Sequence, residues 1–396
     1  MIDSIYIGMS GLTGFSNGLR VIANNTTNLN TPGFKGSSLQ FSDLFAASGG
    51  FGSVGHGVGT PGTLLDFGQG STRTTGGALD LALTGDGLFT IKDSLGKIHY
   101  TRDGRFKFDD SGTLVTATDG SKVMGMAADG TLQEISIAGL RTQLGQATTS
   151  VKLNGNLPSD STTAQTIPVT VFDSLGGSHA LSMVMTKNTP TTTPPPGTPP
   201  PPVTWTVKLM DGTTQVDTSQ QLSFTTGSSA SPPFMTFIFT PAGLPAMSLS
   251  FDLTVGVTSL PSSANLPTLA ATSDGFAPGS ATKETFDASG KLIVTYSNGQ
   301  TADGPQLALG RFDSLDAVQS MGDGRFDAID AGVWHTGVAA SGAFGSIAAG
   351  QVEISNVDLS QEFSDLVIMQ RGFQASSQIV STASDMLQQL LTMKGQ

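Results

Sequence analysis

The side chains that could act as general bases or bind a metal are few in this sequence. Its four histidines are His56, His99, His179 and His335, and none has partners at the spacing of a zinc site or a catalytic triad. The chain has no cysteine, which excludes disulfides, thiolate ligands and cysteine nucleophiles. We therefore expect each histidine to lie at the surface or at a strand edge.

Carboxylates cluster in two places, residues 109–112 and 323–330. A calcium-binding loop needs oxygen ligands at regular alternate positions and a closing glutamate, and neither cluster supplies both. No pair of acids is marked out for glycoside hydrolysis. The run Gly85–Asp86–Gly87 lacks the third glycine of a dinucleotide-binding loop, because Thr90 stands there. We expect turns at both clusters, and a protein without enzymatic activity, cofactor or metal.

The regular pattern of this chain is apolar and lies at its two ends. Near the C-terminus two interleaved rows repeat every seventh residue, which makes the narrow stripe of a coiled coil. Asp358 is the expected N-cap of this helix, with Glu362 in its first turn. A helix docked on its own domain is the alternative. The rows are Leu359, Leu366, Phe373, Val380 and Leu387, and Phe363, Gln370, Ser377, Ser384 and Leu391.

A second narrow stripe occupies residues 1–31 and stops at Pro32 and Gly33, a pair typical of helix ends. Isolated helices of this length are marginal in water. We therefore expect both terminal helices to be largely disordered in the free chain. Since each stripe is too narrow to make a core alone, we expect the two helices to pair with each other or with neighbouring subunits. The two rows of this stripe are Ile5, Leu12 and Leu19, and Phe15, Ile22 and Leu29.

The composition limits the partners of the chain. Its 396 residues carry a net charge of −12 and only 13% charged residues, so neither nucleic acid nor an anionic membrane is an expected partner. No stretch approaches the length of an apolar membrane span, and the first residues do not resemble a secretory signal peptide. If the protein leaves the cytoplasm, we therefore expect a dedicated export route without a cleaved signal peptide.

Between its ends the chain carries 50 glycines in all and alternating apolar and polar residues, which predicts short antiparallel strands. The predicted fold class is mainly β with α-helical termini, in which the N- and C-terminal helices form a coiled-coil-like domain beside two nested β domains. The Pro-rich segment 189–202 is expected to be a stiff surface insertion, with a ligand for a proline-binding module as the alternative. The predicted parts are a terminal helical domain (1–33 and 356–396), an extended linker or flexible loop (34–70), a first β domain (71–147 and 283–355) and an inserted outer β domain (148–282).

Both ends also carry specific motifs. The first motif lies around the predicted end of the first helix and consists of Ala23, Asn24, Asn25, Asn28, Leu29, Asn30, Thr31, Gly33, Phe34 and Lys35. The second motif lies near the C-terminus and includes Asn356, Asp358, Gln370 and Arg371, within 355–363 and 369–376. Together these motifs resemble the two signatures of the flagellar rod and hook family of axial proteins. Thr26 and Thr27 depart from the usual N-terminal pattern.

The resemblance implies a structural subunit of the flagellum outside the cell. The large second β region favours a subunit of the flexible, torque-transmitting hook over a subunit of the rod, which is the first alternative. A secreted β-rich adhesin or enzyme is the second alternative, and it leaves both motifs unexplained. The partners implied are further copies of the chain, the distal rod, a hook cap, hook–filament junction proteins and the flagellar type III export apparatus.

Overall fold

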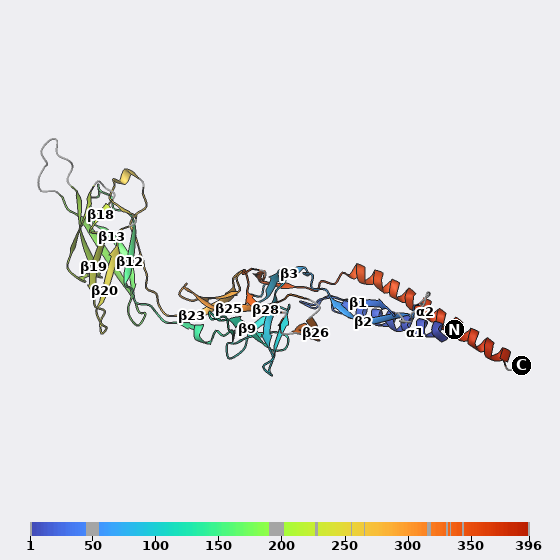
Figure 1. Ribbon diagram of the computed structural model, residues 1–396. Coiled ribbons are helices and arrows are strands. Elements are labelled where there is room, and N and C mark those ends of the chain that lie inside the picture. The colour runs from blue at the N-terminus through green and yellow to red at the C-terminus, as the bar shows by residue number, and fades with distance from the viewer. Residues whose placement is uncertain are drawn as a thin grey trace. The chain divides into compact units, whose positions relative to one another are not determined.

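The computed structural model describes residues 2–44, 55–189, 202–225, 229–254, 256–264, 266–314, 318–329, 332, 334–342 and 344–394 (Figure 1). Residues 190–201, which make up most of the Pro-rich segment, lie outside this description. The chain forms two compact units. Unit 1 comprises Met1–Gly139, Lys283–Val294 and Ala302–Gln396, and unit 2 comprises Leu140–Thr282 and Thr295–Thr301. The predicted fold class, mainly β with helical termini, is confirmed.

Unit 1 begins and ends with its two long helices, α1 (Ile2–Thr27) and α2 (Leu359–Lys394). The predicted cap of α2 is confirmed, because Asp358 Oδ1 accepts hydrogen bonds from the backbone N–H groups of Ser360 at 2.8 Å and Gln361 at 3.3 Å. α1 ends at Thr27, before the predicted stop. The chain then turns through Gly33, whose φ of 68° is the left-handed conformation that favours glycine.

A hairpin of β1 (Ser37–Asp43) and β2 (Val58–Leu65) follows α1. Here the prediction of an extended linker or flexible loop was wrong for the described residues, because these two strands pair in antiparallel register and pack on α1. The Phe41 ring lies 5.9 Å from that of Phe15 on the helix. In β1, Leu39 and Phe41 alternate with polar residues, whereas β2 shows no such alternation.

The β part of unit 1 is organised by one large sheet. Its strands follow the order β24-β25-β9-β5-β6-β27-β26, with β28 on β25, β8 and β10 on β9, and β7 on β8. Two small sheets, β4 with β29 and β3 with β30, join the segments before and after unit 2. The strands are β3 (Thr72–Thr74), β4 (Leu81–Thr84), β5 (Leu88–Lys92), β6 (Ile98–Thr101), β7 (Phe106–Phe108), β8 (Leu114–Thr116), β9 (Lys122–Met126), β10 (Leu132–Glu134), β24 (Lys291–Tyr296), β25 (Thr301–Phe312), β26 (Val318–Gly322), β27 (Arg325–Ala328), β28 (Trp334–Val338), β29 (Ser346–Ala349) and β30 (Gln351–Glu353).

Unit 2 contains the region 148–282 that the sequence analysis predicts as a second β domain. One sheet runs β19-β20-β12-β21 with β22 beside β12, and the other runs β13-β14-β15-β17-β18 with β16 beside β15. Apolar side chains of both sheets meet in one core around Trp205, Phe224, Phe237 and Phe251. The strands are β12 (Ser150–Asn156), β13 (Gln165–Phe172), β14 (Ser178–Lys187), β15 (Val203–Asp211), β16 (Thr214–Gln215), β17 (Gln220–Thr225), β18 (Ser229–Ser231), β19 (Phe234–Phe239), β20 (Met247–Asp252), β21 (Val257–Thr258) and β22 (Ala270–Ser273).

The two-residue strand β11 (Thr142–Gln143) pairs with the eight-residue strand β23 (Gly279–Phe286). Two 3₁₀ turns, η1 (Ala138–Leu140) and η2 (Ser262–Ala264), complete the described elements. Across the described residues, no helix combines the length and apolar character needed to cross a bilayer.

Candidate assembly interface

The two terminal helices lie side by side and antiparallel (Figure 1), and glycines bring them close together. A Cβ atom built on Gly8 would lie 2.7 Å from Val380 Cγ2, and one on Gly11 would lie 2.6 Å from Ser376 Oγ. On α2, Gly372 makes room for a side chain of α1, because a Cβ built on it would lie 2.5 Å from the ring of Phe15. The pair is therefore held by side chains of one helix that fill glycine gaps of the other.

The predicted apolar stripe of α1 faces inward in part. Ile22 is buried, and the others are half-buried: Ile5, Leu12, Phe15, Leu19 and, just beyond the helix, Leu29. Gly8, Gly11 and Gly18 are buried on this same helix and are absent from the predicted stripe. Their signal was present as glycines three and seven residues apart. A glycine carries no apolar side chain, so a search for apolar rows passes over it.

The predicted stripe of α2 divides into an inner and an outer part. Leu366, Val380 and Leu387 are half-buried, whereas Leu359, Phe363, Phe373 and Leu391 are exposed. The prediction that these residues are buried on assembly is not tested by the single chain and stays a prediction. The row that faces α1 is instead Met369, Gly372, Ser376, Val380 and Ala383, in which small residues allow the close approach.

Many apolar side chains of the helical pair have no cover in the single chain. Leu391 is 71% exposed and Phe363 is 55% exposed. Exposed apolar surface of this extent on one helix is typical of a protein interaction site. The exposed residues of the pair are Tyr6 and Met9 on α1, and Leu359, Phe363, Val367, Ile368, Phe373, Ile379, Met386, Leu390, Leu391 and Met393 on α2.

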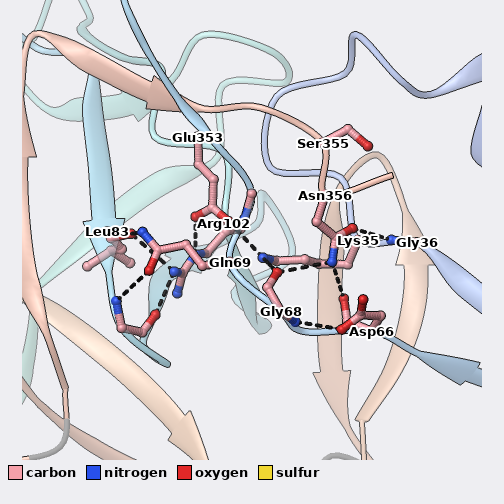
Figure 2. A network of polar contacts seen from close by, with 12 residues as sticks. Lys35, Gly36, Asp66, Gly68, Gln69, Leu83, Arg102, Glu353, Ser355 and Asn356 are labelled. Carbon is pink, nitrogen blue, oxygen red and sulfur yellow. Dashed lines mark hydrogen bonds and ion pairs between the residues drawn. The ribbon is translucent and has the colours of Figure 1, made fainter. Parts of the chain in front are cut away.

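A buried charged cluster fixes the helical end of unit 1 to its β part (Figure 2). Glu353, Lys35 and Arg102 have side chains that are 0%, 1% and 3% exposed. Oε1 of Glu353 accepts hydrogen bonds from Lys35 Nζ at 2.7 Å and from Gly70 N at 2.8 Å, and Oε2 accepts one from Arg102 Nε at 2.5 Å. One carboxylate thus joins three segments that are far apart in sequence.

The remaining donors of the two cations are bonded to backbone oxygens. Lys35 Nζ donates to Gly68 O at 2.8 Å. The Arg102 guanidinium donates to the carbonyl oxygens of Leu83 at 3.1 Å and Gly85 at 2.6 Å, and also to that of Gly87. Because buried charges are tolerated only when they are paired and bonded in this way, the cluster is a complete structural unit.

The environment shifts the pKa values of the cluster. Burial alone would raise the pKa of Glu353, but attraction by Arg102 and the hydrogen bond from Lys35 outweigh it and lower that pKa. Burial lowers the pKa of Lys35, and the hydrogen bond to Glu353 opposes this effect. The carboxylate is therefore held ionised by the two cations around it.

Two asparagines of the predicted family signature reinforce the same junction. Asn25 Nδ2 donates to Ser37 O and to Glu362 Oε1, both at 2.8 Å, and its Oδ1 accepts from Ser37 N at 3.1 Å. Asn356 Oδ1 accepts from Gly36 N at 2.8 Å, and its Nδ2 donates to Asp66 O and Gly68 O (Figure 2). Each amide therefore ties an end of a terminal helix to the hairpin strands beside it.

The other signature residues have smaller local roles or none that the structure shows. Asn28 Nδ2 donates to Asn24 O at 2.9 Å, and Thr31 Oγ1 donates to Asn28 Oδ1 at 3.0 Å, so these residues close the turn after α1. Gly33 packs against the backbone of Arg102. Asn30, Gln370 and Arg371 are exposed, and Phe34 is half-buried. The sequence analysis missed Arg102 and Glu353, since a lone charge in a strand region carries no local sign of its partner.

The expectation that every histidine lies at the surface or at a strand edge was wrong for His99. This side chain is buried in unit 1, where Nδ1 lies 2.5 Å from Asp327 Oδ1 and Nε2 lies 3.2 Å from Asp93 Oδ2. Burial would raise the pKa of Asp327, but hydrogen bonds from Lys97 and His99 lower it. Within the described ranges, no group of three or more histidine and acidic side chains is arranged to hold a metal ion.

Comparison with known families covers both ends and both units. Residues 5–35 match the flagella basal body rod protein family, and residues 348–393 match the flagellar basal body rod FlgEFG protein C-terminal family. Residues 82–157 match the flagellar hook protein FlgE/F/G D1 domain, and residues 154–321 match the flagellar basal body protein FlaE D2 domain. The terminal helices and the β units together define an axial protein of the flagellar rod and hook class.

Full-length relatives make the assignment specific. The chain is 30% identical over 416 residues to the flagellar hook protein FlgE of Escherichia coli, with 98% of each chain covered. It is 30% identical over 419 residues to the flagellar hook protein FlgE of Salmonella typhimurium, again with 98% of each covered. The flagellar basal-body rod protein FlgG of Bacillus subtilis is 25% identical over 412 residues, with 100% of each covered. The chain belongs to the flagellar hook protein family.

Proposed function

We propose that this chain is the structural subunit of the bacterial flagellar hook, and that it polymerises head-to-tail into a flexible tube outside the cell. The observation that carries the proposal is the uncovered apolar surface of α2, which includes Phe363, Phe373 and Leu391. A single chain gains nothing from this surface, whereas a neighbouring copy would remove it from water. Contacts between unlike surfaces give an open helical tube, because they do not close on themselves.

The helical pair is suited to folding during assembly. α1 and α2 touch at glycine gaps that are filled by Val380, Met369 and Phe15, while many apolar side chains of α2 stay exposed in the single chain. Isolated helices of this length are marginal in water, and apolar surface that stays exposed adds nothing to their stability. The terminal helices are therefore ordered by the neighbours that cover α2, and the free chain keeps folded β units with largely disordered ends. A chain without cysteine also suits passage through a narrow export channel in an unfolded state.

The proposed partners follow from the place of a hook in the flagellum. They are further copies of the chain, the distal rod, a hook cap, hook–filament junction proteins and the flagellar type III export apparatus. In this position the polymer is a universal joint, which carries torque from the rod to the filament. The proposed role needs no catalysis, cofactor, nucleic acid or membrane insertion.

Electron microscopy of basal bodies from a strain that lacks the gene tests this function. Rods that end without a hook are expected, and the wild-type gene restores the hook. Hooks that persist in the deletion strain would reject the proposal, and shortened rods would move the protein to the rod.

The same strain tests the contact surface of α2. Restoration with L391D is expected to give no hooks, because a charge would be buried against the neighbouring copy. Q388D adds the same carboxylate at an exposed polar position of the same helix and is expected to keep the hook. Normal hooks from L391D would show that this end of α2 is not a subunit contact.

A further inference from the structure

One seven-residue motif occurs twice, as Asp93-Ser-Leu-Gly-Lys-Ile-His99 and as Asp173-Ser-Leu-Gly-Gly-Ser-His179. In unit 1 it connects β5 to β6, and in unit 2 it connects β13 to β14. Each copy displays a leucine at the tip of its hairpin. Leu95 is 92% exposed and Leu175 is 74% exposed.

Both tips are held by the same hydrogen bonds. Asp173 Oδ1 accepts from the backbone N–H groups of Leu175 at 2.8 Å and Gly177 at 2.9 Å, and His179 Nε2 lies 2.8 Å from Asp173 Oδ2. Gly176 supplies the left-handed φ of 81° that closes the turn. Leu175 is therefore presented on a braced tip, so little conformational freedom of the backbone remains to be lost when a partner covers it.

The surroundings of the two leucines differ. In unit 2 a Cβ on Gly176 would lie 2.4 Å from Pro278 Cδ, and one on Gly145 would lie 2.8 Å from Gly176 Cα. The tip is thus packed on the loop of Leu144, which is 85% exposed, and on the exposed Pro278. In unit 1 the space beside the tip glycine, Gly96, holds only the end of the Lys92 side chain.

We propose that Leu144, Leu175 and Pro278 form a contact patch for a second copy of this chain in the assembled polymer. The proposal rests on the function proposed above and adds a subunit contact in unit 2. Charge supports this occupant, because each copy carries a net charge of −12 and two copies repel wherever their charged surfaces meet. The three segments that build the patch, 142–150, 174–178 and 275–282, contain no charged residue. They therefore offer an uncharged surface, with Leu144, Leu175 and Pro278 exposed on it, where two acidic copies can approach.

The chain has no cysteine, so the variant L175C carries one thiol that reports on this patch. Its labelling by a maleimide-polyethylene glycol is measured in the monomer and in isolated hooks. We expect labelling to be at least about tenfold slower in hooks, because covering an apolar side chain favours the closed contact by about a factor of ten or more over the open one in which the thiol reacts. L95C is the matched control, because it places a thiol on the same motif without the patch, and its labelling is expected to be equal in both states.

Equal labelling of L175C in monomer and hooks would overturn the proposal. Equal protection of L175C and L95C would also overturn it, since protection would then report general crowding in the polymer. A benzophenone coupled to the L175C thiol identifies the occupant: crosslinked dimers in hooks support a second copy, whereas a product confined to one chain and present in the monomer contradicts it. If L175C forms no hooks, L144C allows the same measurements. Hooks that form with an unprotected thiol refute this patch alone, whereas loss of the proposed function would appear in the deletion strain.

Discussion

Replacing Glu353 with glutamine is the most informative single perturbation of unit 1. The change keeps the shape of the side chain and removes its charge. Lys35 and Arg102, whose side chains are 1% and 3% exposed, then remain buried beside a neutral amide. The new NH₂ group also meets a donor, because Arg102 Nε and Lys35 Nζ occupy both oxygen sites of the present carboxylate.

The expected cost follows from the burial of this cluster. Removing one partner from a buried ion pair costs about 3–5 kcal/mol, because an uncompensated charge is left inside the protein. A domain of ordinary stability unfolds with about 5–15 kcal/mol. E353Q should therefore remove a large part of the free energy of unfolding of unit 1. The variant E134Q is the matched control, since Glu134 pairs with Lys122 at 2.8 Å on the surface and such pairs contribute about 1 kcal/mol or less.

The two tryptophans allow the units to be followed separately by fluorescence in urea. Trp334 lies in unit 1, 5.2 Å from the ring of Tyr100, and Trp205 is fully buried in unit 2. In a W205F background the transition of Trp334 is expected to move to much lower urea in E353Q. In a W334F background the transition of Trp205 should stay where it is.

If E353Q lowers the free energy of unfolding no more than E134Q does, the reasoning is refuted, because the buried cluster would then contribute no more than a surface ion pair. The double variant K35M/E353Q gives a second check. It removes one of the two uncompensated cations, so it should recover part of the stability that E353Q loses. If stability is not recovered, the uncompensated charge of Lys35 is not what destabilises unit 1 in E353Q.

Two further predictions concern the helices and the pH dependence of unit 1. Alanine at a helical glycine gains about 1 kcal/mol of helix propensity, but in G372A the new methyl meets the Phe15 ring at 2.5 Å and overpacking costs about 1–3 kcal/mol. G372A should therefore weaken the helical pair, whereas G18A should not, because its methyl meets only the flexible sulfur of Met369. Thermal melting of hooks, followed by circular dichroism, compares the two variants. Equal melting temperatures would contradict the prediction. The lowered pKa of Glu353 gives stability that is full above the unfolded pKa of about 4.3 and is lost as pH falls through the folded value. The stability difference between wild type and E353Q, measured in urea, should shrink below about pH 4 and stay constant above it.

Local signals explain what could be predicted from the sequence. The start of α2 at Leu359 follows from Asp358, because the carboxylate of Asp358 accepts a hydrogen bond from the first turn of its own helix. The mainly β fold follows from the alternation and from the glycine turns, which are also local. The hairpin of β1 and β2 could not be found in this way, because its packing partner is α1 rather than a neighbour in sequence.

The glycine contacts and the charged cluster were missed for a different reason. Gly372 matters only because Phe15 lies opposite, and no rule of spacing connects these positions. Glu353 and Lys35 are 318 residues apart, and each is unremarkable until the fold places them together. Such contacts arise from the fold as a whole, so they need coordinates rather than a pattern.

The position of the charged cluster has a mechanical consequence for a hook subunit. The chain joins the helical ends and their hairpin to the β part of unit 1 through two segments, one between β2 and β3 and one between β30 and α2. The side chain of Glu353, at the end of β30, accepts hydrogen bonds from Gly70 N in the first segment and from Arg102 Nε in the β part, so one carboxylate fastens both segments to the β part. A load that enters through the helices is then shared by both segments. Without the cluster, the hydrogen bonds of Asn356 with Gly36, Asp66 and Gly68 would remain, but the junction would lose the tie between Glu353 and Arg102.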